Sequence, residues 1–319
     1  MIYTKQLSEL EKDNVAIAGG KGASLGEMIQ AGIPVPPGFV VTAQAFEEFL
    51  KVTDLNVELD AVLDHVDHTV MHTVEDASEK IKALILGAEM PLAIAQDIQR
   101  AFKKLDSKYV AVRSSATSED SADAAWAGQL ESYLNTTEDK LLENVKKCWA
   151  SLFTPRAIFY RFEKGLHGKP ISVAVVIQEM VESEVSGIAF SVHPVTQDYD
   201  QLIIEAGFGL GEAIVSGSIT PDSFVVEKSS WNLLDKNITT QERGLFRKDD
   251  GGNEWRDIPT DKGDQPTLTD EEVIELAQLV VKIEKHDGFP VDVEWAREKG
   301  KFYIVQSRPI TTLKKTDGK

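Results

Sequence analysis

Four polar residues late in the sequence have side chains suited to holding a metal ion and a phosphate. Asp292 and Glu294 lie in one run that alternates polar and apolar residues, and Gln306 and Arg308 lie in the next. Carboxylate and amide oxygens are ligands that Mg²⁺ accepts, usually one or two from the protein with phosphate oxygens beside them. A guanidinium can hold a phosphate through paired hydrogen bonds. The alternative is a solvated polar face with a salt bridge, but so many polar groups would be unusual on such an apolar strand pair.

The two runs are expected to form a β-hairpin, because both have period-two alternation and only a short break separates them. A three-residue loop over residues 298–300 would place Gly300 in the left-handed position that such loops need. Glu294 would then lie opposite Ile304, and Asp292 opposite Gln306. Alternation gives a polar face with Asp292, Glu294, Gln306 and Arg308, and an apolar face with Val291, Val293, Trp295, Tyr303 and Val305.

A glycine-rich string, AGGKGASLGEM at residues 18–28, surrounds Lys21. Glycines let backbone N–H groups approach an anion, and the N-terminus of a following helix favours negative charge. The string is not a P-loop, because Val15 stands where the first glycine should be and Gly22 replaces the Ser or Thr after the lysine. A flexible turn before a helix fits the spacing equally well.

A second candidate for phosphate binding is Arg113, in the string YVAVRSSATSED at residues 109–120. An apolar strand delivers the arginine into a loop rich in hydroxyl groups, and arginine is a good phosphate ligand. An arginine that ends a strand beside a solvated loop is an equal alternative. A further string, EAGFGLGE at residues 205–212, is better interpreted as a strand-to-helix turn than as a phosphate loop.

Helices are expected early in the chain and strands later, which indicates an α+β fold. Residues 58–105 are helical and acidic, and Pro91 is expected to open a further helix there. Strands are predicted at residues 109–113, 173–178, 187–191, 201–205 and 223–227. Residues 235–263 are expected to be irregular, with a turn at Asp249–Gly252, and Thr269 to Glu272 form a capping box for a helix that runs to about Lys285.

Length and charge limit the classes of protein. A chain of 319 residues is expected to form two subdomains, with a hinge in residues 178–183 and lobes at 1–180 and 181–314. The formal net charge of −18 argues against nucleic acid and anionic membrane as partners. It also repels a nucleotide such as ATP, so a nucleotide site would need local cations and a metal.

The single cysteine and the apolar runs exclude further classes. Cys148 rules out an intrachain disulfide and a cysteine-cluster metal site, and it is expected to be a buried apolar residue. No run approaches a membrane span, and the first residues have no apolar signal core. A cytoplasmic location is therefore expected.

Five strings together resemble the ATP-binding domain of the phosphoenolpyruvate synthase (pyruvate, water dikinase) family. They are GGKGASLGEMIQAGIPVPPGFVVT, AVRSSATSEDSADAAWAGQLESYLN, CWASLFTPRAIFYR, GFGLGEAIVSGSITPDSFVV and the pair DVEWA and FYIVQSRP. They span nearly the whole chain in family order. The resemblance implies an ATP-grasp-like fold with two lobes and ATP between them.

The resemblance also implies roles for individual residues. Lys21 and Arg113 would be phosphate ligands, and Gly128 would lie in the loop over the triphosphate. Gln178 and Glu179 would lie at the adenine side, with Met180 and Val181 lining the base pocket. Glu294 and Gln306 would hold Mg²⁺, and Arg308 would contact the transferred phosphate; Asp292 joins the metal ligands from the hairpin register alone. Lys21, Arg113 and Arg308 would be the catalytic residues.

The chain departs from the family pattern in two places. Gly22 stands where the family usually has asparagine, which should cost little, and the loop after Arg113 lacks the glycine- and methionine-rich sequence of pyruvate, phosphate dikinase. None of the six histidines lies in a loop suited to carrying a phosphoryl group. We therefore expect the acceptor histidine on a phosphohistidine domain in the same or another chain.

Three functions stay open from the sequence. The first is the ATP-binding phosphotransferase domain of a phosphoenolpyruvate synthase-like dikinase, which would carry out only part of the reaction. The second is the corresponding domain of a rifamycin phosphotransferase. The third is a non-catalytic module that senses nucleotide; the presence of all the charged ligands argues against decay of the site but not against this role.

Overall fold

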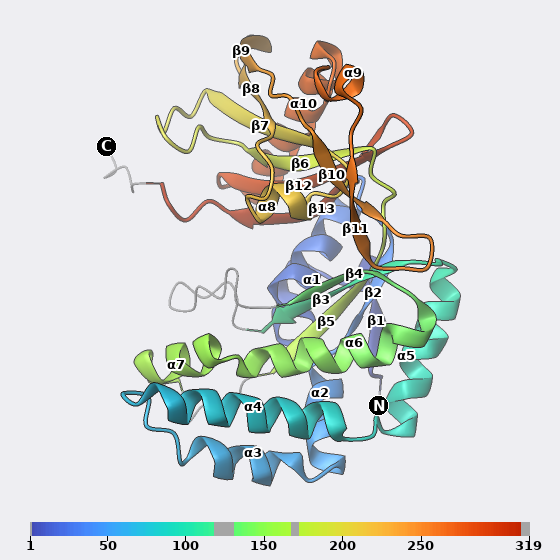
Figure 1. Ribbon diagram of the computed structural model, residues 1–319, viewed down its shortest axis with the longest axis vertical. Helices are drawn as coiled ribbons and strands as arrows, with labels where there is room; N and C mark the ends of the chain where they lie inside the picture. The colour runs from blue at the N-terminus through green and yellow to red at the C-terminus, as the bar shows by residue number, and fades with distance from the viewer. Residues whose placement is uncertain (1, 118–130, 167–171, 314–319) are drawn as a thin grey trace. The chain divides into compact units, whose positions relative to one another are not determined.

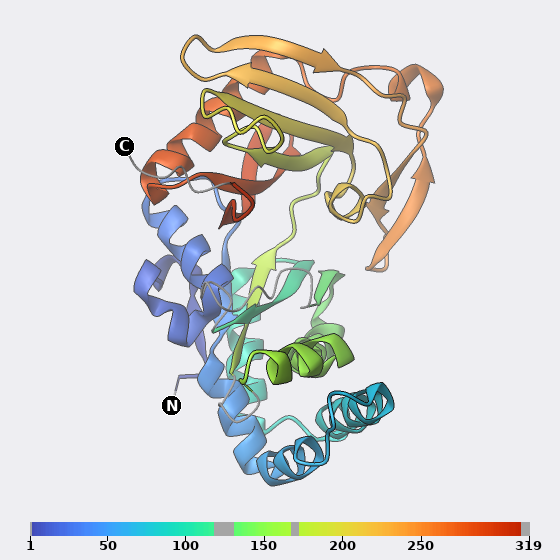
Figure 2. The same ribbon diagram turned by 90° about the vertical axis from the view of Figure 1, so that its left-hand side faces the viewer.

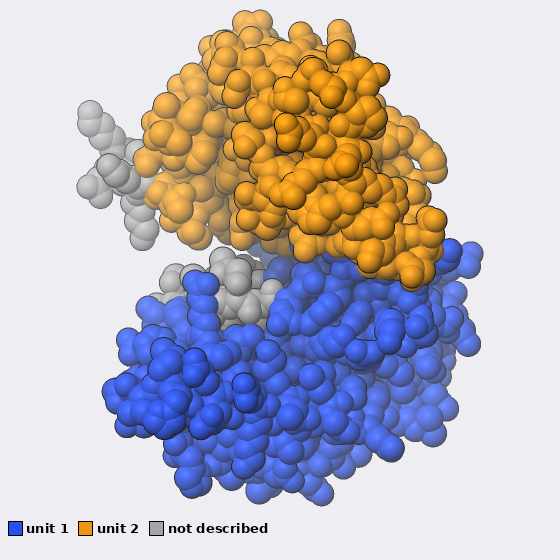
Figure 3. Space-filling view, in the orientation of Figure 1, with its two compact units in different colours: residues 1–27, 37–180 blue, residues 28–36, 181–319 orange. Residues whose placement is uncertain are grey.

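The chain divides into two compact units, which Figure 3 shows in blue and orange. A computed structural model describes residues 2–117, 131–166 and 172–313. Unit 1 consists of Met1–Glu27 and Pro37–Met180, and unit 2 of Met28–Pro36 and Val181–Lys319. Each unit has its own antiparallel sheet and its own buried core.

The sheet of unit 1 has five strands in the order β1-β2-β5-β3-β4, with neighbouring strands antiparallel. These strands are β1 (Thr4–Gln6), β2 (Gly38–Val41), β3 (Val110–Ala116), β4 (Ser132–Thr136) and β5 (Val173–Glu179). Their burial is nearly complete in β2, β3 and β5 because both faces are covered.

Helices lie on one side of this sheet (Figure 1). They are α2 (Ala43–Val52), α3 (Leu55–Leu63), α4 (Met71–Gly87), α5 (Leu92–Leu105), α6 (Glu138–Ala150) and α7 (Pro155–Glu163). Of these, α2, α5 and α6 lie against the strands, and α3 and α4 lie farther from the sheet. Their apolar faces form one core with alternate strand residues, centred on Trp149, whose ring lies 5.5 Å from Phe46 and 5.0 Å from Phe49. The predicted helical region at 58–105 is confirmed as three helices, and the helix predicted after Pro91 is α5.

The opposite face of the unit 1 sheet packs against helix α1 (Val15–Gln30). A side chain at Gly22 would meet Val40 of β2 and Val176 of β5, so the helix lies close to the strands there. The same face carries Arg113 of β3, which pairs with Val176. Helix α1 also contacts β3, because the Gly22 N–H donates to Ser115, which lies 93 residues later in the sequence.

Unit 2 contains a six-stranded antiparallel sheet in the order β13-β12-β6-β7-β8-β9. The strands are β6 (Val185–Phe190), β7 (Gln201–Phe208), β8 (Asp222–Glu227), β9 (Asn232–Asn237), β12 (Val291–Glu298) and β13 (Lys301–Pro309). A separate hairpin is formed by β10 (Arg243–Arg247) and β11 (Asn253–Asp257), and the short helices are α8 (Glu212–Val215) and α9 (Thr260–Gly263).

Helix α10 (Asp270–Asp287) packs on one face of the unit 2 sheet (Figure 2). Residues on the covered face, among them Leu202, Phe224 and Val293, have no exposed surface. Alternate residues of β7 and β8 are half-buried on the opposite face. This period-two pattern is that of an antiparallel sheet with one open face.

The capping box predicted for α10 is confirmed. The Thr269 hydroxyl accepts from the Glu272 backbone N–H at 3.3 Å, and the Glu272 carboxylate accepts from the Thr269 N–H at 2.9 Å. Two N–H groups that the helix itself cannot satisfy are thus bonded.

The substitution Thr269→Ala is expected to lower the free energy of unfolding by about 1 kcal/mol, because it removes this cap. Thr137 is a matched control, since it is the N-cap of α6 but its hydroxyl bonds the Asp139 carboxylate and no helix N–H. Thr137→Ala should cost less than ~0.5 kcal/mol. Urea unfolding measures both, and equal losses would contradict a capping role for Thr269.

The predicted α+β class and all five predicted strands are confirmed, with bounds that differ by a few residues. The prediction that residues 235–263 are irregular was wrong, because β10, β11 and part of β9 lie there; the turn predicted at Asp249–Gly252 joins β10 to β11. Cys148 is fully buried, as predicted. Within the described ranges, no helix combines the length and the apolar character needed to cross a membrane.

Candidate functional site

The hairpin β12–β13 carries the four polar residues, with a register that differs from the predicted one. Its loop has two residues, Lys299 and Gly300, with φ of 50° and 75°. Lys301 therefore pairs with Glu298, whereas a three-residue loop would pair Lys301 with Arg297. Both loop residues have positive φ, which is typical of the turn that matches the twist of a two-residue hairpin. The predicted three-residue loop was wrong.

A bulge at Val305 restores the polar face of this hairpin. Trp295 pairs with Ile304, but the next pair is Glu294 with Gln306, so Val305 is an extra residue in β13. Beyond the bulge, Asp292 pairs with Arg308. The four polar residues thus share one face, although each pairing that was predicted for them was wrong.

The bulge also changes the apolar face. Ile304, which pairs with Trp295, is fully buried there, and Phe302 contacts the Trp295 ring edge-on at 5.6 Å. Tyr303 pairs with Ala296 and is half-buried, and Val305 is half-buried too. The assignment of Tyr303 to the apolar face was therefore wrong.

Two rows of cross-strand neighbours extend from the hairpin over the open face of the unit 2 sheet. The first row runs Gln306, Glu294, Ile188, Glu205, Ser223 and the second runs Arg308, Asp292, Phe190, Ile203, Val225. Polar groups gather on β12 and β13, and half-buried apolar side chains continue on β6, β7 and β8. The face thus offers ligands for charge beside an apolar surface.

Asp292 and Arg308 form an ion pair on this face. Nε of Arg308 donates to Oδ2 of Asp292 at 2.8 Å, and Nη2 lies 2.8 Å from the same oxygen. The side chain of Asp292 is 10% exposed and that of Arg308 46% exposed. The carboxylate is therefore anchored in the sheet, and the guanidinium extends toward solvent.

Two carboxylates on this face, Asp292 and Glu205, have a raised pKa. Burial raises the pKa of Asp292, Arg308 opposes this shift, and the negative charge of Glu294 adds to it. Burial also raises the pKa of Glu205, and Asp292 contributes a smaller rise. Mutual repulsion of carboxylates that are partly removed from water is relieved by a bound cation.

These residues fit a Mg²⁺ ion that is held largely by a ligand. Within residues 2–117, 131–166 and 172–313, no three His, Cys, Asp or Glu side chains form a ready metal cluster. Mg²⁺ commonly takes one or two carboxylates and completes its shell with water and phosphate oxygens. Glu294 and Gln306, paired across the hairpin, supply a donor set of that kind.

The glycine-rich string around Lys21 forms a kinked helix in unit 1. Gly19 has φ 68° and ψ 172°, which interrupts α1 just before Lys21. This backbone conformation is open almost only to glycine. The kink allows Gly19 to lie against Ser115, because any side chain there would overlap the Ser115 carbonyl and hydroxyl oxygens.

Gly22 and Gly26 of the same string pack closely against their neighbours. The Gly22 N–H donates to the Ser115 hydroxyl at 3.2 Å, and a Cβ at Gly26 would lie 2.5 Å from that of Leu10. The expectation that these glycines expose N–H groups to an anion is therefore not met at Gly22, whose N–H is engaged. Gly19 and Gly22 bring α1 onto Ser115 of β3 and thereby place Lys21.

Lys21, Arg113 and Gln178 lie on the same side of the unit 1 sheet. The Lys21 ammonium donates to the Ser114 carbonyl at 3.1 Å, next to Arg113. Arg113 pairs with Val176, two residues before Gln178 on β5, so both side chains point to the α1 face. Both are buried, at 9% and 2% exposure.

The remaining candidates follow Gln178 at the end of β5. The Glu179 N–H donates to the Pro37 carbonyl at 2.9 Å, and the Met180 N–H to the Tyr109 carbonyl at 3.0 Å. Glu179 and Met180 are half-buried, and Val181, the first residue of the second segment of unit 2, is buried. Gly128 lies outside the described residues.

Sequence reasoning missed two residues of these sites. Ser115 holds the Lys21 turn through its contacts with Gly19 and Gly22, but nothing in its hydroxyl-rich string distinguishes it. Glu205 lies in the first row beside Ile188 and Ser223. The alternation of residues 201–205 could have identified Glu205, since it is a carboxylate at a period-two position of an apolar strand.

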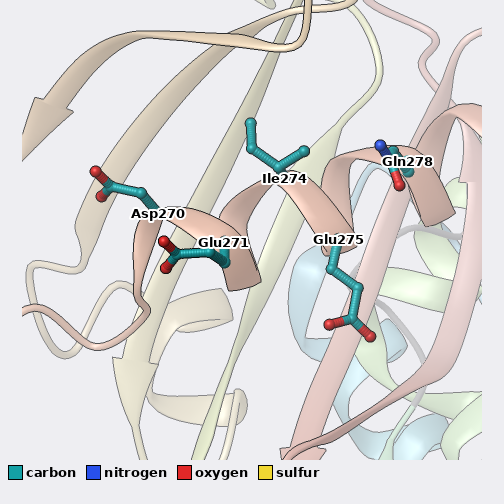
Figure 4. Close-up of a pocket in the computed structure, with 5 residues that line it drawn as sticks. All are labelled: Asp270, Glu271, Ile274, Glu275 and Gln278. Carbon is teal, nitrogen blue, oxygen red and sulfur yellow. The ribbon is translucent and has the colours of Figure 1, made fainter.

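A surface hollow of about 430 Å³ lies on α10 (Figure 4). Its lining is Asp270, Glu271, Ile274, Glu275 and Gln278, all from the solvent side of that helix. Three carboxylates line the hollow, and Lys236 pairs with one of them, Asp270, at 2.6 Å, so the remaining negative charge would repel a phosphate. The hollow does not suit a nucleotide, and it is separate from the open sheet face.

Comparison with known proteins gives consistent matches. Residues 15–319 match the family described as pyruvate phosphate dikinase, AMP/ATP-binding domain. The probable phosphoenolpyruvate synthase of Methanocaldococcus jannaschii is 46% identical over 322 residues, which cover 99% of this chain and 27% of that protein. That of Archaeoglobus fulgidus is 47% identical over 97% of this chain and 42% of that protein.

The chain is also similar, over nearly its whole length, to a phosphotransferase that is not named as a phosphoenolpyruvate synthase. The rifampicin phosphotransferase of Bacillus subtilis is 40% identical over 316 residues, which cover 96% of this chain and 36% of that protein. The chain therefore spans less than half the length of each of these relatives.

Proposed function

Because the chain belongs to the pyruvate phosphate dikinase AMP/ATP-binding domain family, we propose that it is the ATP-binding phosphotransferase domain of a phosphoenolpyruvate synthase-like dikinase. Its fold is α+β and ATP-grasp-like. In this proposal it acts in the cytoplasm and transfers a phosphoryl group from Mg-ATP to a histidine on another domain or chain.

The observation that carries this proposal is the open face of the unit 2 sheet. Glu294 and Gln306 would hold Mg²⁺, with Arg308 beside them for a phosphate. The apolar side chains in the same two rows offer a surface for the rest of a nucleotide. ATP has a charged triphosphate and an apolar base. A site for it therefore needs polar and charged ligands next to an apolar surface, and this sheet face has both.

Unit 1 would supply further cations and the base-side residues. Lys21 and Arg113 would bind phosphate oxygens, and Gln178, Glu179 and Met180, with Val181 after them, would contact the adenine side. Gly128 would complete the phosphate site. We propose that the two units correspond to the functional lobes 1–180 and 181–314.

The proposed chemistry needs positioning and charge neutralisation more than covalent steps by this domain. Phosphoryl transfer spreads negative charge over the oxygens of the moving group, and fixed cations stabilise it. Lys21, Arg113 and Arg308 would do so, and a bound Mg²⁺ would neutralise phosphate charge beside Glu294 and Gln306. The histidine that accepts the group would come from a phosphohistidine domain.

A transfer assay tests the proposal. The chain is incubated with Mg²⁺, ATP labelled in its phosphates, and the histidine-bearing domain of a full-length relative. We expect acid-labile label on that domain, and no phosphoenolpyruvate when the chain receives only pyruvate and ATP. Label that never leaves ATP, or phosphoenolpyruvate made by the chain alone, would contradict the proposal.

The identity to rifampicin phosphotransferase supports a second candidate function, in which the same ATP site serves phosphorylation of a rifamycin-type drug. Both functions need the same nucleotide ligands. Supplying the remaining domains of each kind of relative in turn, with pyruvate or with rifampicin, distinguishes them by the product formed.

The substitution Lys21→Gln is expected to weaken ATP binding about tenfold, because one charge-assisted hydrogen bond to a phosphate is lost. AMP binding should change less, since fewer phosphate oxygens are present. Lys147→Gln is the control, because Lys147 lies on α6, which packs on the other face of the unit 1 sheet, and pairs with Glu143. Calorimetry measures each affinity; equal effects of the two substitutions would contradict the role of Lys21.

A further inference from the structure

The pair of Asp292 and Arg308 has a geometry that leaves the arginine able to bind a second anion. Nε and Nη2 both lie 2.8 Å from Oδ2 of Asp292, so the carboxylate occupies one edge of the guanidinium. An arginine has five N–H donors arranged around a plane. The edge formed by Nη1 and the outer N–H of Nη2 faces away from Asp292 and is wide enough for two phosphate oxygens.

The two partners differ in how firmly the fold holds them. Asp292 lies on β12, an inner strand of the sheet, and its backbone pairs with Phe190 of β6 on one side and Arg308 of β13 on the other. Arg308 lies on the edge strand β13, and its long side chain is nearly half exposed. An exposed arginine loses considerable side-chain entropy when a ligand fixes it. A carboxylate that already holds it reduces that loss.

The pairing also limits what Asp292 can do for a metal. Its Oδ2 accepts from Arg308, and a cation at that oxygen would lie close to the guanidinium charge. Glu294, one position along the same face, pairs with the neutral Gln306 instead. The cross-strand neighbour is thus a guanidinium for Asp292 and a neutral amide for Glu294.

We propose that Asp292 is a positioning residue, which holds the guanidinium of Arg308 in the orientation that binds a nucleotide polyphosphate, and is not a ligand of the metal. This inference deepens the proposed function and rests on it. It replaces the expectation that Asp292 binds Mg²⁺, which came from the hairpin register that the structure corrects.

A double-mutant cycle in saturating Mg²⁺ tests this role, with ATP and AMP affinities measured by calorimetry on the full chain. Arg308→Gln should weaken ATP binding about tenfold and leave AMP binding unchanged. Asp292→Asn should weaken ATP binding about fivefold when Arg308 is present. In the Arg308→Gln background it should change ATP binding by less than about twofold, because no guanidinium remains to be oriented.

A magnesium titration at fixed ATP separates positioning from metal ligation. Asp292→Asn should leave the Mg²⁺ concentration at half-saturation unchanged, whereas Glu294→Gln should raise it. A raised Mg²⁺ requirement in Asp292→Asn, or equal effects of that substitution in both Arg308 backgrounds, would overturn the positioning role. Unchanged AMP affinity shows that the variants are folded.

Two further outcomes keep the inference distinct from the proposed function. If Asp292→Asn does not fold, Arg308→Lys tests the same pair, since an ammonium cannot offer separate edges to a carboxylate and a phosphate. Wild-type ATP affinity in Arg308→Lys would overturn the inference. Failure of the unmodified chain to bind Mg-ATP would overturn the proposed function as well, whereas binding with additive effects would overturn only the role of Asp292.

Discussion

The substitution Gly19→Ala is expected to lower the free energy of unfolding by about 3 kcal/mol, from backbone strain and overpacking together. The backbone of Gly19, at φ 68° and ψ 172°, lies in a region that residues with a Cβ rarely enter. The added methyl group would also overlap the carbonyl oxygen of Ser115, which β3 holds in place. Relief requires α1 to move away from the strand, and Lys21 would move with it.

Gly217 provides the control for Gly19. Its φ is 69°, but a Cβ there would meet no atom within 4 Å. Gly217→Ala should therefore show only the cost of positive φ, about 1 kcal/mol. Urea unfolding of both variants isolates the contact with Ser115. Equal destabilisation by the two substitutions would show that α1 does not depend on this close approach.

The substitution Glu294→Gln is expected to weaken binding of ATP in the presence of Mg²⁺ about 100-fold, or ~2.8 kcal/mol. Glutamine preserves the size of the side chain and its place opposite Gln306, but it removes the charge that a metal needs. Without Mg²⁺, ATP binding should stay the same or strengthen, because one carboxylate no longer repels the phosphates. Calorimetry with Mg²⁺ and with a chelator measures both effects.

Glu298→Gln is the matched control for Glu294. Glu298 lies on the same strand, where its carboxylate accepts from Lys299 and from the Glu182 N–H near the hairpin loop. Its loss should change ATP affinity by less than about twofold, as for an exposed ion pair. A similar loss of affinity in both variants would point to a general charge effect, and the assignment of Glu294 to the metal would fail.

The hairpin shows which features of a site the sequence determines. Period-two alternation placed the four polar residues on one face, because each strand keeps its side chains on fixed sides of the sheet. The pairing could not be predicted, since Lys299 gives no signal for a two-residue turn and Val305 none for a bulge. The loop is one residue shorter than predicted, and the bulge at Val305 adds one residue to β13. The two differences compensate each other, so the predicted face was right and the predicted cross-strand partners were wrong.

The glycines around Lys21 show the opposite case. Their sequence fits a loop that approaches an anion or a flexible turn, whereas in the structure Gly19 and Gly22 lie against Ser115, which is far away in sequence. A contact of that kind depends on how α1 meets β3, and local sequence carries no information about it. For the same reason the polar strands β10 and β11 were missed, since part of their placement comes from a bridge between Leu245 and Gly209.

Titration of the unmodified chain with ATP, with and without Mg²⁺, tests the central claim most directly. The proposed site on the open face of the unit 2 sheet, where Glu294 and Gln306 would hold Mg²⁺, predicts one site per chain and much tighter binding of ATP when Mg²⁺ is present. AMP should bind more weakly and with little dependence on Mg²⁺. Absence of ATP binding, or binding of ATP that Mg²⁺ does not strengthen, would contradict the account.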